Sequence, residues 1–367
     1  MLDRRTVGAA LAPLAFIGLL AAPLQLEPRA HRLVAIFAAV MIAWVCEVVP
    51  IAVTALAIGP LLVVMDVTDA ATAFRYYGDP LLFLFIGGFM LAEAMRRHGL
   101  DRRFAHAVVS LPFVRGSAWR TQVAIVCAAA LMSMWISNTA TCAIFVPLLL
   151  GTSGLAKLPK EGASRDPATG PLLALAYVCS TGGLGTPLGS PPNLITIRLL
   201  ESAGVQLGFV EWLAIGVPSA IVLSIVAAVI TMRNGRGDEP VDGEQLVEPS
   251  ARWSRGERVT AVCFAAAVIG WALPAVVEAT GASIAGALNR SMHVGAVAIL
   301  ACIPLFVLRD PSRRDTATGE MPSMLPWSSA VKIDWGVILL FGGGISLGTQ
   351  LEETGLAGAI AEAAVLA

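Results

Sequence analysis

The chain has 367 residues, of which 56% are hydrophobic and 14% are charged, and its formal net charge is −1. Together with a mean hydropathy of +0.76, this composition predicts a polytopic membrane protein rather than a soluble domain. The near-zero net charge gives no sign of a nucleic-acid partner, so we expect the lipid bilayer to be the main surroundings of the chain.

Apolar runs that are long enough to cross a bilayer recur along the whole sequence. They cover about residues 7–24, 32–49, 51–67, 80–95, 171–197, 209–232, 258–277, 292–308 and 335–351. The first run follows a basic start and has a cleaved signal peptide as its alternative. Because many more runs follow it, we expect an uncleaved first helix. Arginines in the short loops, such as Arg96–Arg97 and Arg233, predict a cytoplasmic side and a multi-pass protein of the bacterial inner membrane.

Two stretches interrupt this pattern with small polar residues. They are MSMWISNTATCAIFVP (132–147) and CSTGGLGTPLGSPPNLI (179–195). In hydrocarbon, a helix can break only where protein or an aqueous cavity satisfies the freed backbone groups. We therefore expect a re-entrant helical hairpin at about 120–150 and a broken transmembrane helix at about 171–200. Broken helices of this kind indicate a binding site at membrane depth.

A repeat links two distant parts of the chain. LFIGGFMLAEAMRRHGL (84–100) matches LFGGGISLGTQLEETGL (340–356) without a gap, at an offset of 256 residues. Chance similarity of two glycine-containing helices is the alternative. An odd number of crossings is predicted between the copies, so they would cross in opposite directions, as in inverted-repeat transporters. The same offset puts the partners of both interruptions beyond residue 367, so we expect one complete repeat and only the opening of the second.

The predicted fold class is therefore an all-α polytopic membrane protein with an inverted repeat. Four segments are expected along it. They are N-terminal scaffold helices at 1–110, a first transport unit at 111–235, a cytoplasmic linker at 236–256 and the start of the incomplete second repeat at 257–367.

The two interrupted stretches resemble motifs of a known family. WISNTATCAIFVP (135–147) and GGLGTPLGSPPN (182–193), supported by WVCEVVP (44–50) and FIGGFMLAEA (85–94), are similar to the divalent anion:sodium symporters, the carboxylate and sulfate transporters of solute carrier family 13. The resemblance runs from about residue 30 to the C-terminus. It implies a homodimeric secondary transporter that couples sodium to the symport of a small divalent anion, with a C4-dicarboxylate as the first choice.

The resemblance also implies roles for individual residues. Sodium would be held by Ser133, Ser137 and Asn138 with the carbonyl of Gly189. The anion pocket would be lined by Ser137, Asn138, Thr139, Ser190 and Pro191. In that family a second Ser-Asn-Thr motif and a second broken helix complete the site, and neither has a counterpart before residue 367.

The chemistry of these residues agrees with that implication. Sodium is a hard cation that prefers oxygen ligands, which serines, an asparagine and free carbonyl groups supply. A carboxylate or sulfate is stabilised by the N–H groups and the dipole of a helix N-terminus. Neither interruption contains a lysine or arginine, so we expect the anion to depend on bound sodium.

Several other functions remain open at this point. The anion could be sulfate or citrate. Proton coupling or antiport in a related inverted-repeat fold would require an intramembrane Asp or Lys near the breaks, and none occurs there. A non-transporting remnant is a third alternative. An enzyme is not expected, because the six cysteines form no CxxC pair, the four histidines form no metal motif, and Ser137 has no nearby histidine or lysine.

Overall fold

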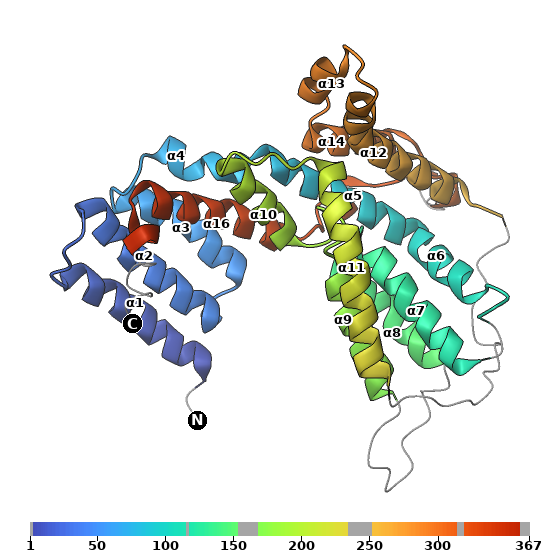
Figure 1. The fold of residues 1–367 in the computed structure, drawn as a ribbon, viewed down its shortest axis with the longest axis horizontal. Coiled ribbons are helices and arrows are strands. Elements are labelled where there is room, and N and C mark those ends of the chain that lie inside the picture. Colours follow the sequence, from blue (N-terminus) through green and yellow to red (C-terminus); the bar gives the residue numbers. More distant parts are fainter. Residues whose placement is uncertain (1–2, 115–116, 153–167, 234–251, 314–318, 360–367) are drawn as a thin grey trace, which may run out of the picture. The chain divides into compact units, whose positions relative to one another are not determined.

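The computed structural model describes residues 3–114, 117–152, 168–233, 252–313 and 319–359 (Figure 1). Regular structure in these ranges is helical, apart from an isolated bridge between Arg309 and Ser323. Five helical stretches among them are long and apolar enough to cross a membrane, and the described ranges contain further, shorter apolar helices. This confirms the predicted all-α polytopic membrane class.

The described residues pack into two compact units, Met1–Leu82 with Asp334–Ala367, and Phe83–Ile333. The units are defined by packing alone. The functional division of the chain at residues 110, 235 and 256 therefore remains a prediction.

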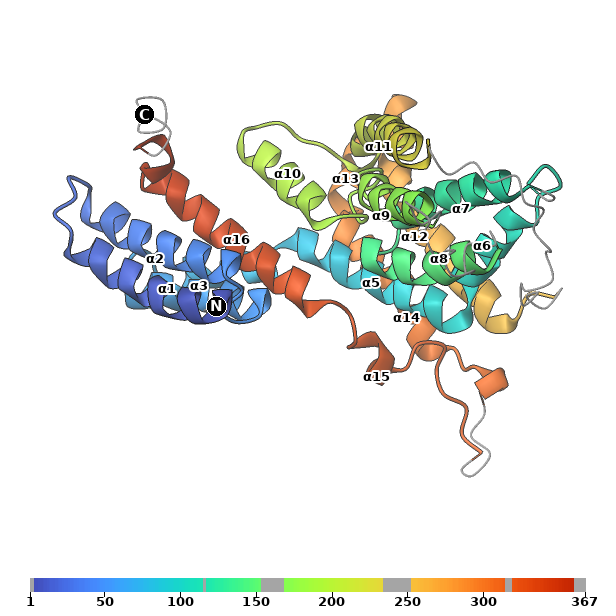
Figure 2. The ribbon, with the colours of Figure 1, turned by 90° about the horizontal axis from the view of Figure 1, so that it is seen from below.

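The first unit joins the two ends of the sequence. It contains α1 (Arg4–Ala21), α2 (Pro28–Val45), α3 (Ile51–Val64), α4 (Ala70–Arg75), the short η1 (Tyr76–Gly78) and α16 (Trp335–Glu353). Helices α1 and α2 lie side by side, as Figure 2 shows, and α16 packs against α3. The fully buried side chains of Leu33, Ile36 and Ile58 form its core together with Leu347 of α16.

The second unit contains both interrupted stretches. Its helices are α5 (Pro80–His98), α6 (Leu100–Val109), α7 (Ala118–Ser133), α8 (Asn138–Thr152), α9 (Thr169–Gly182), α10 (Pro191–Ser202), α11 (Phe209–Met232), α12 (Arg255–Ala279), α13 (Ala285–Ser291), α14 (Val294–Val307) and α15 (Trp327–Ala330), with the short η3 (Pro311–Arg313). Helix α9 packs against α7, α8 and α11 (Figure 1). Buried Ile125, Phe145 and Leu175 fill the space between α7, α8 and α9, so these three helices form a rigid support for the breaks.

The predicted apolar runs coincide with helices to within a few residues. Helix α12 begins at Arg255, where Ser254 and Glu257 form a capping box; residues 236–251 of the predicted linker lie outside the described ranges. Helix α6 was not predicted, since it is short and carries several charges. It is fixed by Arg103, whose guanidinium donates to both carboxylate oxygens of Glu257 at 2.6 and 3.1 Å.

The two copies of the predicted repeat form closely similar helices. Helices α5 and α16 each have 19 residues. An aspartate accepts a backbone N–H at the start of each, Asp79 from Leu81 and Asp334 from Val337. Each helix is followed by a glycine with positive φ, Gly99 at 75° and Gly355 at 70°, a conformation that favours glycine. The internal similarity is thus present in the local structure, while the opposite direction of the two copies remains a prediction.

Candidate functional site

Both interruptions fold as non-helical segments at the places where the sequence predicts them. Helix α7 ends at Ser133 and α8 begins at Asn138, which leaves 134–137 as the first break. Helix α9 ends at Gly182 and α10 begins at Pro191, which leaves 183–190 as the second break. The local causes are plain: Ser137 Oγ accepts the N–H of Ala140 at 3.4 Å, and two prolines occupy the first turn of α10, where their missing N–H groups cost least.

The two breaks contact each other directly. Ser133 Oγ donates to the carbonyl of Cys179 at 2.5 Å, and Thr186 Oγ1 donates to the carbonyl of Met134. A Cβ atom on Gly189 would lie 2.4 Å from the Gly183 carbonyl oxygen and 2.9 Å from that of Ser133. The backbones therefore approach so closely that only glycine fits at position 189.

A cluster of oxygen atoms surrounds the side-chain amide of Asn138. When the amide is oriented to satisfy its neighbours, its nitrogen lies 2.7 Å from Ser133 Oγ, 2.9 Å from the Cys179 carbonyl oxygen and 3.3 Å from the Gly189 carbonyl oxygen. In the opposite orientation, Ser133 Oγ donates to Asn138 Oδ1 at 2.7 Å. The orientation with the nitrogen inward is the one that satisfies the two carbonyl oxygens, which cannot donate; the three oxygens come from the end of α7, from α9 and from the second break.

The candidate residues divide into an inner and an outer group. Ser133 and Gly189 are buried and Asn138 is half-buried, whereas Ser137 and Thr139 are exposed and Ser190 and Pro191 are half-buried. The structure brings Ser133, Asn138 and Gly189 into one cluster. It does not add the Ser137 hydroxyl to this cluster, because Ser137 Oγ caps the first turn of α8.

The two helix N-termini at the breaks differ in what they offer an anion. At α8 the N–H groups of Asn138 and Thr139 lie in the first turn, where no intrahelical acceptor exists. At α10 the first two helical residues are Pro191 and Pro192, which have no N–H. The N-terminus of α10 therefore offers an anion fewer backbone donors than the N-terminus of α8. The Ser190 hydroxyl does not cap α10. It can therefore serve as a hydrogen-bond donor at the N-terminus of α10.

Three residues that position the breaks were not identified from the sequence. Asn193 is 2% exposed, and its Nδ2 donates to the carbonyls of Gly183 and Thr186 at 2.7 and 2.8 Å. Trp212 Nε1 of α11 donates to the Leu184 carbonyl at 3.0 Å. Thr186 and Asn193 lie within the second polar stretch, 179–195. The amide side chain of Asn193 in an otherwise apolar helix was the signal that could have identified this residue. No sequence signal pointed to Trp212, since a tryptophan at a helix end is usually an interfacial anchor.

Trp212 allows a direct test of how the second break is held. Trp212→Phe keeps the aromatic ring but removes the donor to Leu184, which leaves that carbonyl without its partner at a cost of about 1–3 kcal/mol. We expect amide hydrogen exchange of residues 183–190 to accelerate by about tenfold or more. Trp271→Phe is the matched control, because Trp271 Nε1 makes an equivalent bond at 2.9 Å to the carbonyl of Val294, which belongs to neither break. Equal acceleration by the two variants would show that Trp212 has no special role.

Glycines of α5 also support the second break. A Cβ atom on Gly88 would lie 2.5 Å from the Leu188 side chain, and one on Gly87 would lie 2.6 Å from Ala298. The missing side chains at these two positions thus permit the close approach of Leu188 and Ala298. Both neighbours belong to the same chain.

The family model and the relatives that match this chain are all described as transporters. The model of the citrate transporter family, CitMHS, matches residues 37–367. An uncharacterized transporter of Haemophilus influenzae is 29% identical over 93% of the chain and 69% of its own length. A sodium-dependent dicarboxylate transporter, SdcS, of Staphylococcus saprophyticus is 29% identical over 97% of the chain and 69% of its own length. SdcS of Staphylococcus aureus is 28% identical over 86% of the chain, which spans 61% of that relative.

Proposed function

Because the chain belongs to the citrate transporter family, we propose that it couples sodium to the symport of a small divalent anion, with a C4-dicarboxylate as the leading substrate. The chain is a multi-pass membrane transporter and not an enzyme. Two relatives that carry the name sodium-dependent dicarboxylate transporter support the choice of ion and substrate. Their identity to this chain is below 30%, so both choices depend on the site itself.

The observation that carries the proposal is the oxygen cluster at Asn138. Ser133 Oγ and the carbonyl oxygens of Cys179 and Gly189 all face one end of its amide. Without a cation, the amide nitrogen donates to these oxygens. When sodium binds, the amide would turn by half a rotation so that Oδ1 joins the three other oxygens around the ion. Four neutral oxygens suit a hard monovalent cation, and the Cys179 carbonyl is a ligand that sequence motifs do not reveal.

The outer group of residues is proposed to hold the anion. Ser137 and Thr139 lie at the N-terminus of α8, where free N–H groups and the helix dipole stabilise negative charge. Ser190 and Pro191 lie at the start of α10, and the Ser190 hydroxyl would donate to the second carboxylate. Asn138 belongs to both groups, so an ion bound at the inner cluster would fix the first turn of α8 for the anion.

This arrangement links ion and anion energetically. Neither break contains a cationic side chain, so sodium would supply the full positive charge close to the substrate. A transport cycle that carries more sodium charge than anion charge is driven by the membrane potential, at about 2.3 kcal/mol per elementary charge per 100 mV. Coupling would then follow from electrostatics in a low-dielectric site rather than from a separate gate.

Uptake by the purified protein in proteoliposomes tests the proposal. We expect radiolabelled succinate to accumulate when an inward sodium gradient is imposed, and to stop accumulating when potassium replaces sodium. Liposomes without protein are the control. Accumulation that follows a pH gradient and ignores sodium would instead favour proton coupling, and the absence of accumulation under either gradient would contradict symport by this chain.

Citrate is the second candidate substrate, because the matching family model is described as a citrate transporter. Unlabelled citrate and sulfate added to the succinate assay distinguish the candidates by competition. A homodimer is proposed on the family resemblance alone. The molar mass of the protein in detergent distinguishes a dimer from a monomer.

A further inference from the structure

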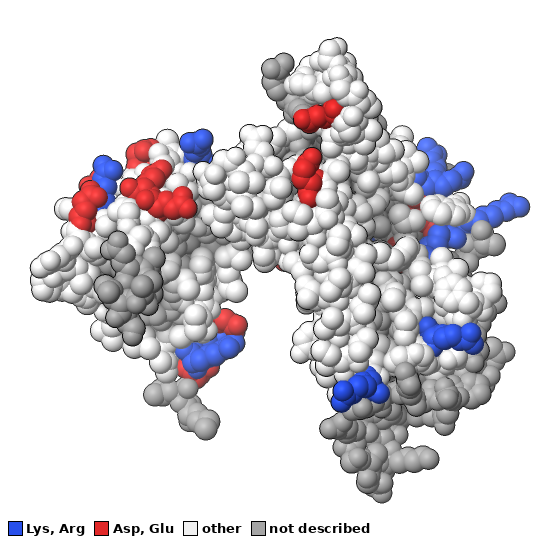
Figure 3. Space-filling view, in the orientation of Figure 1, with Lys and Arg blue, Asp and Glu red and all other residues white. Residues whose placement is uncertain are grey.

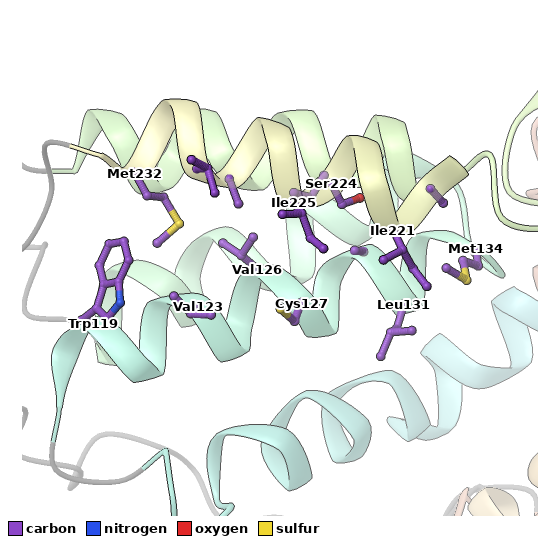
Figure 4. Close-up of a pocket in the computed structure, with 15 residues that line it drawn as sticks. Trp119, Val123, Val126, Cys127, Leu131, Met134, Ile221, Ser224, Ile225 and Met232 are labelled. Carbon is purple, nitrogen blue, oxygen red and sulfur yellow. The ribbon is translucent and has the colours of Figure 1, made fainter. Parts of the chain in front are cut away.

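A long apolar groove lies away from the polar site, between α7, α9 and α11. Its volume is about 450 Å³, within the range of sites that bind small ligands. Figure 4 shows its lining side chains, which are aliphatic, aromatic or sulfur-containing except for Ser224. The Ser224 hydroxyl is already bonded to Thr181 Oγ1 at 2.7 Å. The groove therefore offers a ligand hydrophobic contact and almost no polar partner, and it does not suit a dicarboxylate.

The groove has the dimensions and setting of one lipid chain. It runs from Trp119 to Met134 along α7 and from Met232 to Ala220 along α11, which corresponds to roughly 18–22 Å at 1.5 Å per helical residue. One leaflet of a bilayer has a hydrocarbon depth of about 15 Å. The groove is open along part of its length, since the lining residues Leu131 and Ile225 are 51% and 57% exposed. A hydrocarbon chain can therefore enter from the side and lie along the groove.

One end of the groove carries the features of a headgroup region. Trp119 and Met232 line that end, and the exposed cation Arg233 follows Met232 in the sequence. The same end of α7 and α11 shows blue and no red side chains among the described residues in the view of Figure 3. A tryptophan beside arginines is typical of a membrane–water interface on the positively charged side. The exposed guanidinium of Arg233 is thus complementary to an anionic phosphate.

From these observations we propose that the groove binds one acyl chain of an anionic phospholipid, with the lipid phosphate beside Arg233. The lipid would cover the apolar faces of α7 and α11 and hold them at a fixed separation. Helix α7 leads into the first break and α11 carries Trp212, so a bound lipid would brace two elements that support the polar site. This binding site is independent of the transported ion and anion.

Photo-crosslinking of the purified protein in nanodiscs tests the proposal. The probe is phosphatidylglycerol with a diazirine near the end of one acyl chain, and labelled peptides are identified by mass spectrometry. We expect labels on residues 119–134 and 220–232. Cys127→Trp places a large ring in the groove from an exposed position, and it is expected to reduce labelling about tenfold, because displacing even two methylene groups from an apolar site has an effect of that order.

Matched variants separate the groove from general contact with lipid. Val226→Trp adds the same ring to an exposed residue of α11 outside the groove lining, and it should leave labelling of 119–134 unchanged. Arg233→Gln should lower labelling by phosphatidylglycerol more than labelling by the phosphatidylcholine analogue. Equal labelling of the wild type and Cys127→Trp would overturn the acyl-chain site, and equal capture of both lipids would overturn its anionic selectivity. Failure of Cys127 to react with maleimide after lipid removal would show that protein covers the groove.

Discussion

Replacing Asn138 with alanine is expected to abolish sodium-dependent binding of a dicarboxylate while the protein stays folded. The substitution removes the only side-chain oxygen that can turn toward Ser133 Oγ and the carbonyls of Cys179 and Gly189 in this cluster. Sodium affinity should fall by roughly 10- to 100-fold or more, because changes of even the outer partners of metal ligands have effects of that size. Calorimetric titration with sodium measures the loss, and succinate titration at fixed sodium measures its consequence for the anion.

Thr141→Val is the control for Asn138→Ala. Thr141 lies one turn further along α8, and its hydroxyl donates to the Ser137 carbonyl of its own helix at 3.1 Å, as polar residues in membrane helices commonly do. Removing that hydroxyl should leave sodium affinity unchanged. Unaltered sodium binding by Asn138→Ala would remove the cluster from the proposed ion site, whatever happened to the anion.

Gly189→Ala is the second substitution for which we expect a large effect. The added methyl group would lie 2.4 Å from the Gly183 carbonyl oxygen and 2.9 Å from the Ser133 carbonyl oxygen. Both obstacles are backbone atoms that cannot rotate away, so Gly189 would have to move away from Gly183 within the second break and from the end of α7. We expect a destabilisation of about 1–3 kcal/mol and the loss of sodium-dependent uptake, measured by thermal unfolding and by the proteoliposome assay.

Gly344→Ala is the matched control because nothing lies within 4 Å of a Cβ atom at that position. It lies inside α16, where alanine is favoured over glycine by about 0.5–1 kcal/mol, so thermal stability should rise slightly. The two glycine-to-alanine changes are thus expected to have opposite signs. A Gly189→Ala protein that transports normally would be incompatible with the close contact between the breaks.

The helices and both breaks could be predicted from the sequence because their signals are local. A run of apolar residues fixes a spanning helix, and Pro191–Pro192 after a glycine-rich run fixes an interruption, without knowledge of any partner. The cluster at Asn138 could be predicted only in part. Ser133, Asn138 and Gly189 were named through a family resemblance, and the structure brings them together. The carbonyl of Cys179 was missed, since any residue supplies a carbonyl and its position depends on how α9 packs against α7.

Hydrogen bonds between residues that are far apart in the sequence could not be predicted either. Trp212 and Leu184 are 28 residues apart in the sequence, and no periodicity connects them. The loss of donors at α10 could have been predicted, because Pro191 and Pro192 are visible in the sequence and their chemistry is fixed.

The hydrogen bonds that join the breaks have a consequence for folding. Ser133 with Cys179, and Thr186 with Met134, connect two helical pairs, α7 with α8 and α9 with α10. Opening either pair would strip buried polar partners from the other, so α7 to α10 should open and close as one cooperative foldon. Neither hairpin is then expected to reach its final shape in the membrane until the other has been inserted, and the site would appear in a single late step of biogenesis.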